Sequence, residues 1–291
     1  MTQLKILNWN VNQRSGLGEQ IPDVVINELK HLDADVVCLT EYKNHFEFCE
    51  QLKSLGYSLF MYPEYIEKFQ NEILIAIKTK FVTLPKLTTF PKEDMFPDFL
   101  HLQIDFEGTP LHIIGARIKI ATINNKLPYN RKLPLLVKDA KERLLQIEYI
   151  TEYVRKLNGN ILIMGDFNNY HYFEHQKTDS WEHDNEFLQN YYSYPLVVEK
   201  MNEVNLATYS PTGNYDEVYS WINPKIRADN IKRYIRNDHL FSNLAEISDI
   251  KYSWEFTKNP KYQSKVGVPD HAILTACLLY TSPSPRDRTR S

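Results

Sequence analysis

Short apolar runs recur along the chain, and each ends near a glycine, a proline or a small polar residue. Runs of this length are typical of β-strands, and the uninterrupted run at residues 161–164 is typical of a strand buried on both faces. Gly108-Thr-Pro between two runs indicates a hairpin. The pattern predicts strands at residues 4–11, 35–39, 57–61, 72–77, 99–106, 111–118, 161–164, 218–222, 238–242, 250–256 and 272–278.

Apolar residues spaced three and four apart predict the helices. One helix is expected to begin near Pro22, which suits a first turn, and another to end at Gly56. The longest ends at Asn158-Gly159. The predicted ranges are about 22–32, 46–55, 133–157, 184–191 and 195–203. Strands outnumber helices and no linker divides the chain, so we predict a single α/β (α+β) domain over residues 1–278, with two β-sheets and helices outside.

Composition narrows the class of protein. The chain has 291 residues, 43% hydrophobic and 24% charged, with a net charge of -3, so any polyanion must bind at a local patch. We see no leader peptide and no apolar run of about 20 residues, and we expect a soluble cytoplasmic protein that does not enter a membrane. Residues 279–291 resemble a disordered or non-native tail; nucleic-acid contact by its arginines is the alternative.

Polar side chains follow several of the predicted strands. Asp166 and Asn168 come after the buried run and Gly165, and alternate residues of an extended chain point the same way. A carboxylate beside an amide suits a hard cation, or a base next to a phosphate. Each residue alone fits an ordinary turn or cap. Their recurrence at strand ends indicates one active-site rim, with Asn10, Glu41, Asp166, Asn168, Asp238, Asp270 and His271 as candidates.

These residues lie in short motifs whose order resembles a known family. The motifs are Trp9-Asn10-Val11-Asn12, Leu39-Thr40-Glu41, Gly165-Asp166-Phe167-Asn168, Asn237-Asp238-His239-Leu240 and Pro269-Asp270-His271, with Arg143 and Gln146 as an Arg-x-x-Gln pair. From residue 4 to 277 they resemble the endonuclease/exonuclease/phosphatase superfamily, whose members include DNase I, apurinic endonucleases and inositol polyphosphate phosphatases. The resemblance implies a four-layer sandwich of two mixed β-sheets packed face to face, with helices on the outside.

The resemblance also implies roles for the side chains. Glu41 and Asn10 would hold Mg²⁺, with Mn²⁺ as a substitute, and Asp270 would ligate a metal or steady its loop. Asp166 would orient or deprotonate water, and Asn168 would hold a phosphoryl oxygen. The remaining catalytic pair is His271 positioned by Asp238. Whether Asp166 or His271 carries the proton stays open.

Other residues are expected to bind substrate. Arg117 stands where many relatives carry Asn-x-His or tyrosine, and it would grip a phosphate unless it is a surface arginine. Asn12 and Arg236 are further candidates. The basic segment 225–236 fits a polyanion or a solvated loop, and aromatic residues at 170–181 fit base stacking or the core.

Together these features predict a metal-dependent hydrolase of phosphate esters. Our first hypothesis is a monomeric phosphodiesterase, a nuclease acting on nucleic acid by metal-assisted in-line attack of water. The alternatives are a phosphatase of a small, inositol or lipid phosphate, and a non-catalytic binding scaffold.

Overall fold

The computed structural model describes most of the chain. The described residues are 2–12, 23–43, 45–62, 72–90, 97–121, 123–124, 127–169, 194–214, 216–223, 233–244, 246–260 and 268–280. Five groups of sequence predictions lie outside them: the helix start at Pro22, the helical patch at 184–191, the aromatic segment 170–181, most of the basic segment 225–236 and all but two residues of the tail 279–291.

The first sheet has six strands in the order β13-β14-β1-β2-β4-β3. Their bounds are β1 Thr2–Asn10, β2 Val36–Thr40, β3 Tyr57–Met61, β4 Ile73–Lys78, β13 Ile247–Ser253 and β14 Ile273–Tyr280. β1 runs parallel to β2, and the other pairs are antiparallel. The sheet is therefore mixed, and its parallel pair brings the carboxyl ends of β1 and β2 to one edge.

The second sheet also has six strands, in the order β5-β6-β7-β8-β12-β9. Their bounds are β5 Lys86–Thr89, β6 Asp98–Phe106, β7 Thr109–Arg117, β8 Asn160–Asp166, β9 Ala207–Tyr209 and β12 Asp238–Ser242. β7 and β8 are parallel, so their carboxyl ends also share an edge. A separate antiparallel pair consists of β10 (Trp221–Asn223) and β11 (Arg233–Ile235).

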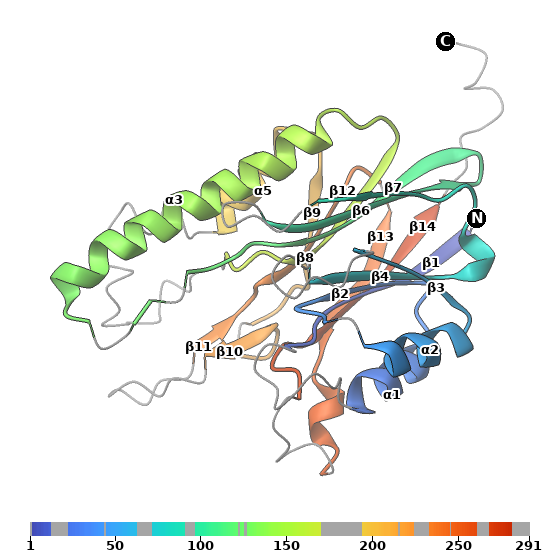
Figure 1. Cartoon of the computed structure of the whole chain (residues 1–291), viewed down its shortest axis with the longest axis horizontal. Coiled ribbons are helices and arrows are strands. Elements are labelled where there is room, and N and C mark those ends of the chain that lie inside the picture. The colour runs from blue at the N-terminus through green and yellow to red at the C-terminus, as the bar shows by residue number, and fades with distance from the viewer. Residues whose placement is uncertain are drawn as a thin grey trace.

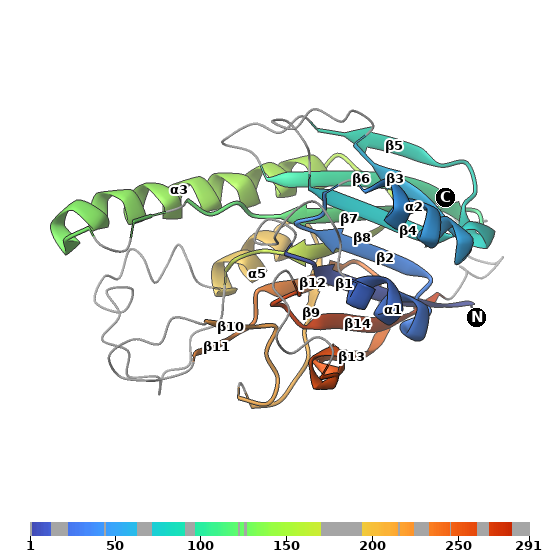
Figure 2. The same cartoon turned by 60° about the horizontal axis from the view of Figure 1, so that its bottom comes forward.

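The two sheets pack face to face through alternating apolar side chains of both (Figures 1 and 2). Ile6 of β1, Ile75 of β4, Leu102 of β6 and Met164 of β8 belong to this shared core. The sheets approach closely at Gly115, where an added Cβ would lie 2.6 Å from the side chain of Ile73. Burial of this apolar surface is the main force that holds the two sheets together.

Helices cover the outer faces (Figures 1 and 2). α1 (Asp23–Leu32) and α2 (Phe46–Ser54) pack on the first sheet, and α3 (Tyr129–Val154) and α5 (Tyr194–Asn202) pack on the second. Short 3₁₀ helices occupy Thr79–Phe81 and Glu255–Lys258. The predicted four-layer sandwich is confirmed. None of the helices in the described ranges is long and apolar enough to cross a bilayer.

Two buried histidines attach the end of α3 to the second sheet. His112 Nε2 lies 2.9 Å from the Asn158 carbonyl, so this nitrogen carries the proton. His101 Nε2 then donates to His112 Nδ1 over 2.9 Å, and Tyr153 donates to His101 Nδ1 over 2.8 Å. Burial, helped by the neighbouring His112, lowers the pKa of His101 to about 4.

Several element boundaries differ from the prediction. β10 begins at Trp221 rather than residue 218, and β13 ends at Ser253 before a 3₁₀ helix. β5, β9 and β11 were not predicted, because three or four residues with mixed polarity leave no clear period. The long helix begins four residues before the predicted 133, with Pro134 inside it. β14 continues to Tyr280, beyond the predicted boundary of 278.

Candidate active site

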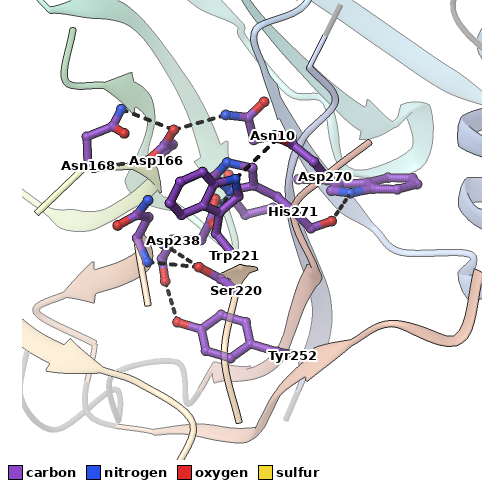
Figure 3. Close-up of polar contacts among 12 residues, drawn as sticks. Asn10, Asp166, Asn168, Ser220, Trp221, Asp238, Tyr252, Asp270 and His271 are labelled. Atoms are coloured by element: carbon purple, nitrogen blue, oxygen red, sulfur yellow. Dashed lines mark hydrogen bonds and ion pairs between the residues drawn. The ribbon is translucent and has the colours of Figure 1, made fainter. Parts of the chain in front are cut away.

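The predicted residues meet where strands of the two sheets end on one rim (Figure 3). Asn10 is the last residue of β1 and Asp166 the last of β8, and Glu41 follows the end of β2. Asp238 opens β12 and pairs directly with Asp166 across the antiparallel β8–β12 ladder. Sheet register therefore brings together residues that are far apart in the sequence.

Asp166 is the centre of one hydrogen-bonded group. The Asn10 amide donates to Asp166 Oδ2 over 2.9 Å, which joins the two sheets. The Asn168 side chain donates to the same oxygen over 3.2 Å, and the main-chain N–H of Asn168 donates to Oδ1 over 2.9 Å. Asp166 is only 1% exposed. Burial, with the nearby charge of Asp238, raises the pKa of this carboxyl above its ordinary value despite the opposing charge of His271.

His271 and Asp238 form the second group. His271 Nδ1 donates to Asp238 Oδ2 over 2.8 Å, and the two residues are 6% and 0% exposed. Burial alone would lower the pKa of His271, but the charge and hydrogen bond of Asp238 outweigh it and raise the pKa to about 10. The imidazole is therefore cationic at neutral pH and can donate a hydrogen bond or a proton.

Three side chains that the sequence analysis missed support Asp238. The Ser220 hydroxyl accepts the main-chain N–H of Asp238 over 3.2 Å, and the Tyr252 hydroxyl donates to its carbonyl over 2.6 Å. The Asn8 amide lies 3.4 Å from Asp238 Oδ1. Asn8 had a usable signal, since it alternates with Asn10 on the predicted strand. Nothing in the sequence pairs Ser220 or Tyr252 with Asp238.

Two of the strand ends use the same local turn. The side-chain oxygen of Asn10 accepts the N–H of Asn12, as that of Asp166 accepts the N–H of Asn168, both over 2.9 Å. Asn12 and Asn168 have φ of 48° and 50°, in the left-handed region that asparagine tolerates. Glu41 also lies there, with φ of 53°, which is unusual for a long side chain. Of the three, only Glu41 therefore adopts a strained conformation at the site.

Gly165 is required by close packing of the backbone beside Asp166. A Cβ at this position would lie 1.7 Å from the Ala116 carbonyl oxygen of β7. Glycine therefore lets β7 and β8 place Arg117 opposite Asp166 in the parallel ladder. This contact explains the glycine of the Gly-Asp-x-Asn motif.

α3 fixes the loops beneath the site through the Arg-x-x-Gln pair. Arg143 donates to the Asn168 carbonyl over 2.6 Å and is held by Asp139, 3.0 Å away. Gln146 both accepts from and donates to the main chain of Lys119, over 2.7 and 3.0 Å. The helix therefore positions the chain after both β7 and β8.

Arg117 lies in a different setting from the expected phosphate contact. Its guanidinium is 3% exposed and donates to Glu41 Oε1 from Nη2 and Nε, over 2.7 and 3.0 Å. Nη1 donates to Asp98 Oδ2 over 3.2 Å. The guanidinium is bonded to carboxylates, and not available to a phosphate, because several acidic side chains surround it. Burial alone would lower the pKa of Arg117, but Glu41, Asp98, Asp166 and Glu72 together raise it.

Two further candidates bond to other parts of the protein in the structure. The Arg236 guanidinium donates to the carbonyls of Val218, Pro211 and Gly213, over 2.7, 3.2 and 2.7 Å. Asp270 Oδ2 accepts the indole N–H of Trp221 over 3.2 Å, beside His271 (Figure 3). For Arg236 and Asp270, binding of substrate or metal therefore stays a prediction.

Glu41 provides the best-placed oxygen for a cation. Its Oε1 is taken by Arg117, whereas Oε2 has no hydrogen bond or ion pair with any described residue. A carboxylate oxygen on a partly exposed side chain, with the Asn10 amide on the same rim, has the chemistry that a hard divalent ion requires. The described ranges contain no group of three or more Asp, Glu, His or Cys side chains arranged to hold a metal. These residues therefore fit an ion that keeps most of its waters.

Comparison with known proteins identifies the family and the fold. Residues 7–231 match the sequence model of the Endonuclease/Exonuclease/phosphatase family. Among solved structures, TDP2 of D. rerio with a single-strand DNA product is 14% identical with a TM-score of 0.59, covering 96% of this chain and 100% of that one. TDP2 of C. elegans is 12% identical with a TM-score of 0.61, covering 96% of this chain and 75% of that one. An AP endonuclease of Archaeoglobus fulgidus is 15% identical with a TM-score of 0.59, covering 95% of this chain and 100% of that one. No curated protein matches the sequence. At such low identity, the structural similarity establishes the fold.

Proposed function

The chain belongs to the endonuclease/exonuclease/phosphatase family, whose sequence model spans most of its length, and from this we propose a metal-dependent phosphodiesterase that hydrolyses nucleic acid. One observation carries the proposal. Buried Asp166 and the His271–Asp238 pair meet on the rim where Glu41 Oε2 is unbonded by any described residue. A base, an acid and a cation ligand are the groups that phosphate ester hydrolysis needs.

The two titratable groups have complementary tasks. The raised pKa of Asp166 makes it a stronger base toward an attacking water than an ordinary aspartate. The cationic His271, held by Asp238, donates to a phosphoryl oxygen. Asn168 donates its side-chain N–H groups to Asp166 and to the Ile118 carbonyl, so it positions the base; holding a phosphoryl oxygen would require one of these bonds to open. We therefore assign proton removal to Asp166 and hydrogen-bond donation to His271.

Glu41 and Asn10 would hold the cation, with Asp270 as a further candidate. When bound, a divalent ion neutralises charge that develops on the phosphoryl oxygens. We propose Mg²⁺ as the working ion, Mn²⁺ as a substitute, and a cytoplasmic monomer. These choices rest on the oxygen-only donor set and on the sequence-based expectations.

Nucleic acid is the proposed substrate for two reasons. The D. rerio TDP2 structure holds a single-strand DNA product, and two other similar structures are AP endonucleases, from Archaeoglobus fulgidus and Leishmania major. In this chain, the partly exposed Trp221 lies with its ring centroid 6.3 Å from that of His271. A flat aromatic face beside the proposed acid can stack against a base.

The test is hydrolysis by purified protein. With Mg²⁺ it should nick plasmid DNA or degrade single strands, and EDTA should stop the reaction. Asp166→Asn should lower the rate by about 10²–10⁴-fold, the usual contribution of a general base. Glu152→Gln, which removes a carboxylate from the exposed face of α3, is the matched control. Full activity of Asp166→Asn, or activity that persists in EDTA, would contradict the proposal. Phosphate release from monoesters alone would favour a phosphatase.

A further inference from the structure

The Arg117 guanidinium bridges carboxylates from both sheets. Glu41 follows β2 of the first sheet, whereas Asp98 opens β6 of the second, and Asp98 is paired with Arg117 in the β6–β7 ladder. Nε and Nη2 share Glu41 Oε1, and Nη1 takes Asp98 Oδ2. The side chains of Arg117 and Asp98 are 4% and 0% exposed, and that of Glu41 is 14% exposed. The Arg117 guanidinium is therefore enclosed by protein at the buried end of the site.

The local charge explains why a cation is held there. Four carboxylates act on the Arg117 charge: Glu41, Asp98, Asp166 and Glu72. One guanidinium against four carboxylates leaves a formal charge of -3, and the His271–Asp238 pair adds nothing net. A single divalent ion would reduce the formal charge from -3 to -1. The charge balance alone would therefore permit a further cation.

In a two-metal site the second cation lies about 3.5–4 Å from the first, close to the same acidic side chains. Here the oxygens that would bridge to a second ion, Glu41 Oε1 and Asp98 Oδ2, already accept N–H groups. Among the described residues nothing bonds to Glu41 Oε2, which leaves it for one ion. We propose that Arg117 replaces a second divalent cation, so that it positions Glu41 and limits the site to a single metal ion. This inference rests on the proposed metal-dependent function.

Arginine suits this task better than lysine. Its charge persists at every working pH, and its planar fork can direct separate N–H groups to Glu41 and Asp98 at once. Lysine would keep the charge but not this two-sided geometry. The two substitutions therefore separate the effect of charge from that of positioning.

The experiment counts bound ions without substrate. Titration calorimetry with Mn²⁺ and Mg²⁺ should give one site in the wild type. Electron paramagnetic resonance spectra at excess Mn²⁺ should show no spin-coupled pair of manganese ions. Arg117→Gln should bind two ions. Its first ion should bind about tenfold more tightly, the effect on a dication of losing one unit charge at ~6 Å in a dielectric of ~80. Arg117→Lys should still bind one ion.

The outcomes separate the two proposals. A wild type that binds no ion would overturn the proposed function and this inference together. A single ion in both the wild type and a folded Arg117→Gln, with unchanged affinity, would overturn this inference alone. Melting with and without Mn²⁺ reports whether the variant is folded. If it is not, the wild-type spectrum decides: a coupled manganese pair refutes a single-ion site, and its absence at saturation supports one.

Discussion

Replacing Asp238 with asparagine would remove the charge that keeps His271 protonated. The change is nearly isosteric, and the amide oxygen can still accept from His271 Nδ1 at the present 2.8 Å. Geometry is therefore kept while the carboxylate charge is lost. The pKa of His271, now about 10, should then fall toward the ordinary 6.5, because burial opposes only the smaller effects of Asp166 and Asp270 once the Asp238 charge is gone.

The size of the effect follows from these pKa values. At pH 8 a group with a pKa of about 10 is almost fully protonated, whereas one at or below 6.5 is protonated in about 3% of molecules. With a pKa near 6.5, the variant should thus lose about 30-fold in kcat/KM at pH 8 from protonation alone. The deficit should shrink as the pH falls, because His271 regains its proton.

The assay is a pH profile of kcat/KM from pH 5 to 10 at saturating metal, for the wild type and Asp238→Asn. The alkaline limb should move from about 10 toward 6.5. In metal-free protein, the His271 ring resonances should titrate with the same shift, which reports on the histidine directly. Glu152→Gln should leave both curves unchanged. Parallel profiles, with an unmoved alkaline limb, would refute the claim that Asp238 controls the charge of His271.

Two further predictions concern stability. His101 is neutral in the folded protein with a pKa of about 4, against 6.5 in the unfolded chain, so unfolded molecules bind more protons below pH 6.5. The free energy of unfolding, measured by urea melts, should fall by about 3 kcal/mol between pH 6.5 and pH 4. The substitution His101→Gln should flatten this pH dependence. An equally steep curve for the variant would contradict the assignment to His101. Gly165→Ala should destabilise the fold by more than about 3 kcal/mol, because its Cβ would meet the Ala116 carbonyl at 1.7 Å. Gly56→Ala, where only the φ of 85° opposes a side chain, should cost about 1 kcal/mol, and similar melting temperatures for the two would argue against the steric explanation.

Much of the architecture could be predicted because burial leaves a periodic trace. The continuous run at residues 161–164 predicted β8, and the apolar stripe of 133–157 predicted most of α3. The predicted family is confirmed by the family model that matches residues 7–231. Strands such as β9 and β11 escaped, because their existence depends on a neighbouring strand rather than on their own pattern.

The sequence predicted which residues lie at the site better than it predicted the contacts between them. The structure joins Asn10 to Asp166 and Asp238 to His271, as a shared rim requires. It turns Arg117 toward Glu41, because a side chain at the end of β7 faces acids from two other strands. The roles of these residues remain predictions until the variants are measured.

The amino-acid order alone determined which segments become strands and helices, and which chemical groups stand at strand ends. Folding added the partners, through strand register and sheet packing. Residues 8, 166 and 238 are distant in sequence. The β8–β12 ladder places Asp238 opposite Asp166, and the face-to-face sheets bring Asn8 to Asp238 and Asn10 to Asp166. Local periodicity reports only whether a side chain is buried. The charge that each buried group meets depends on segments that the chain brings together over more than a hundred residues, so the state of His271 and the task of Arg117 became visible only in three dimensions.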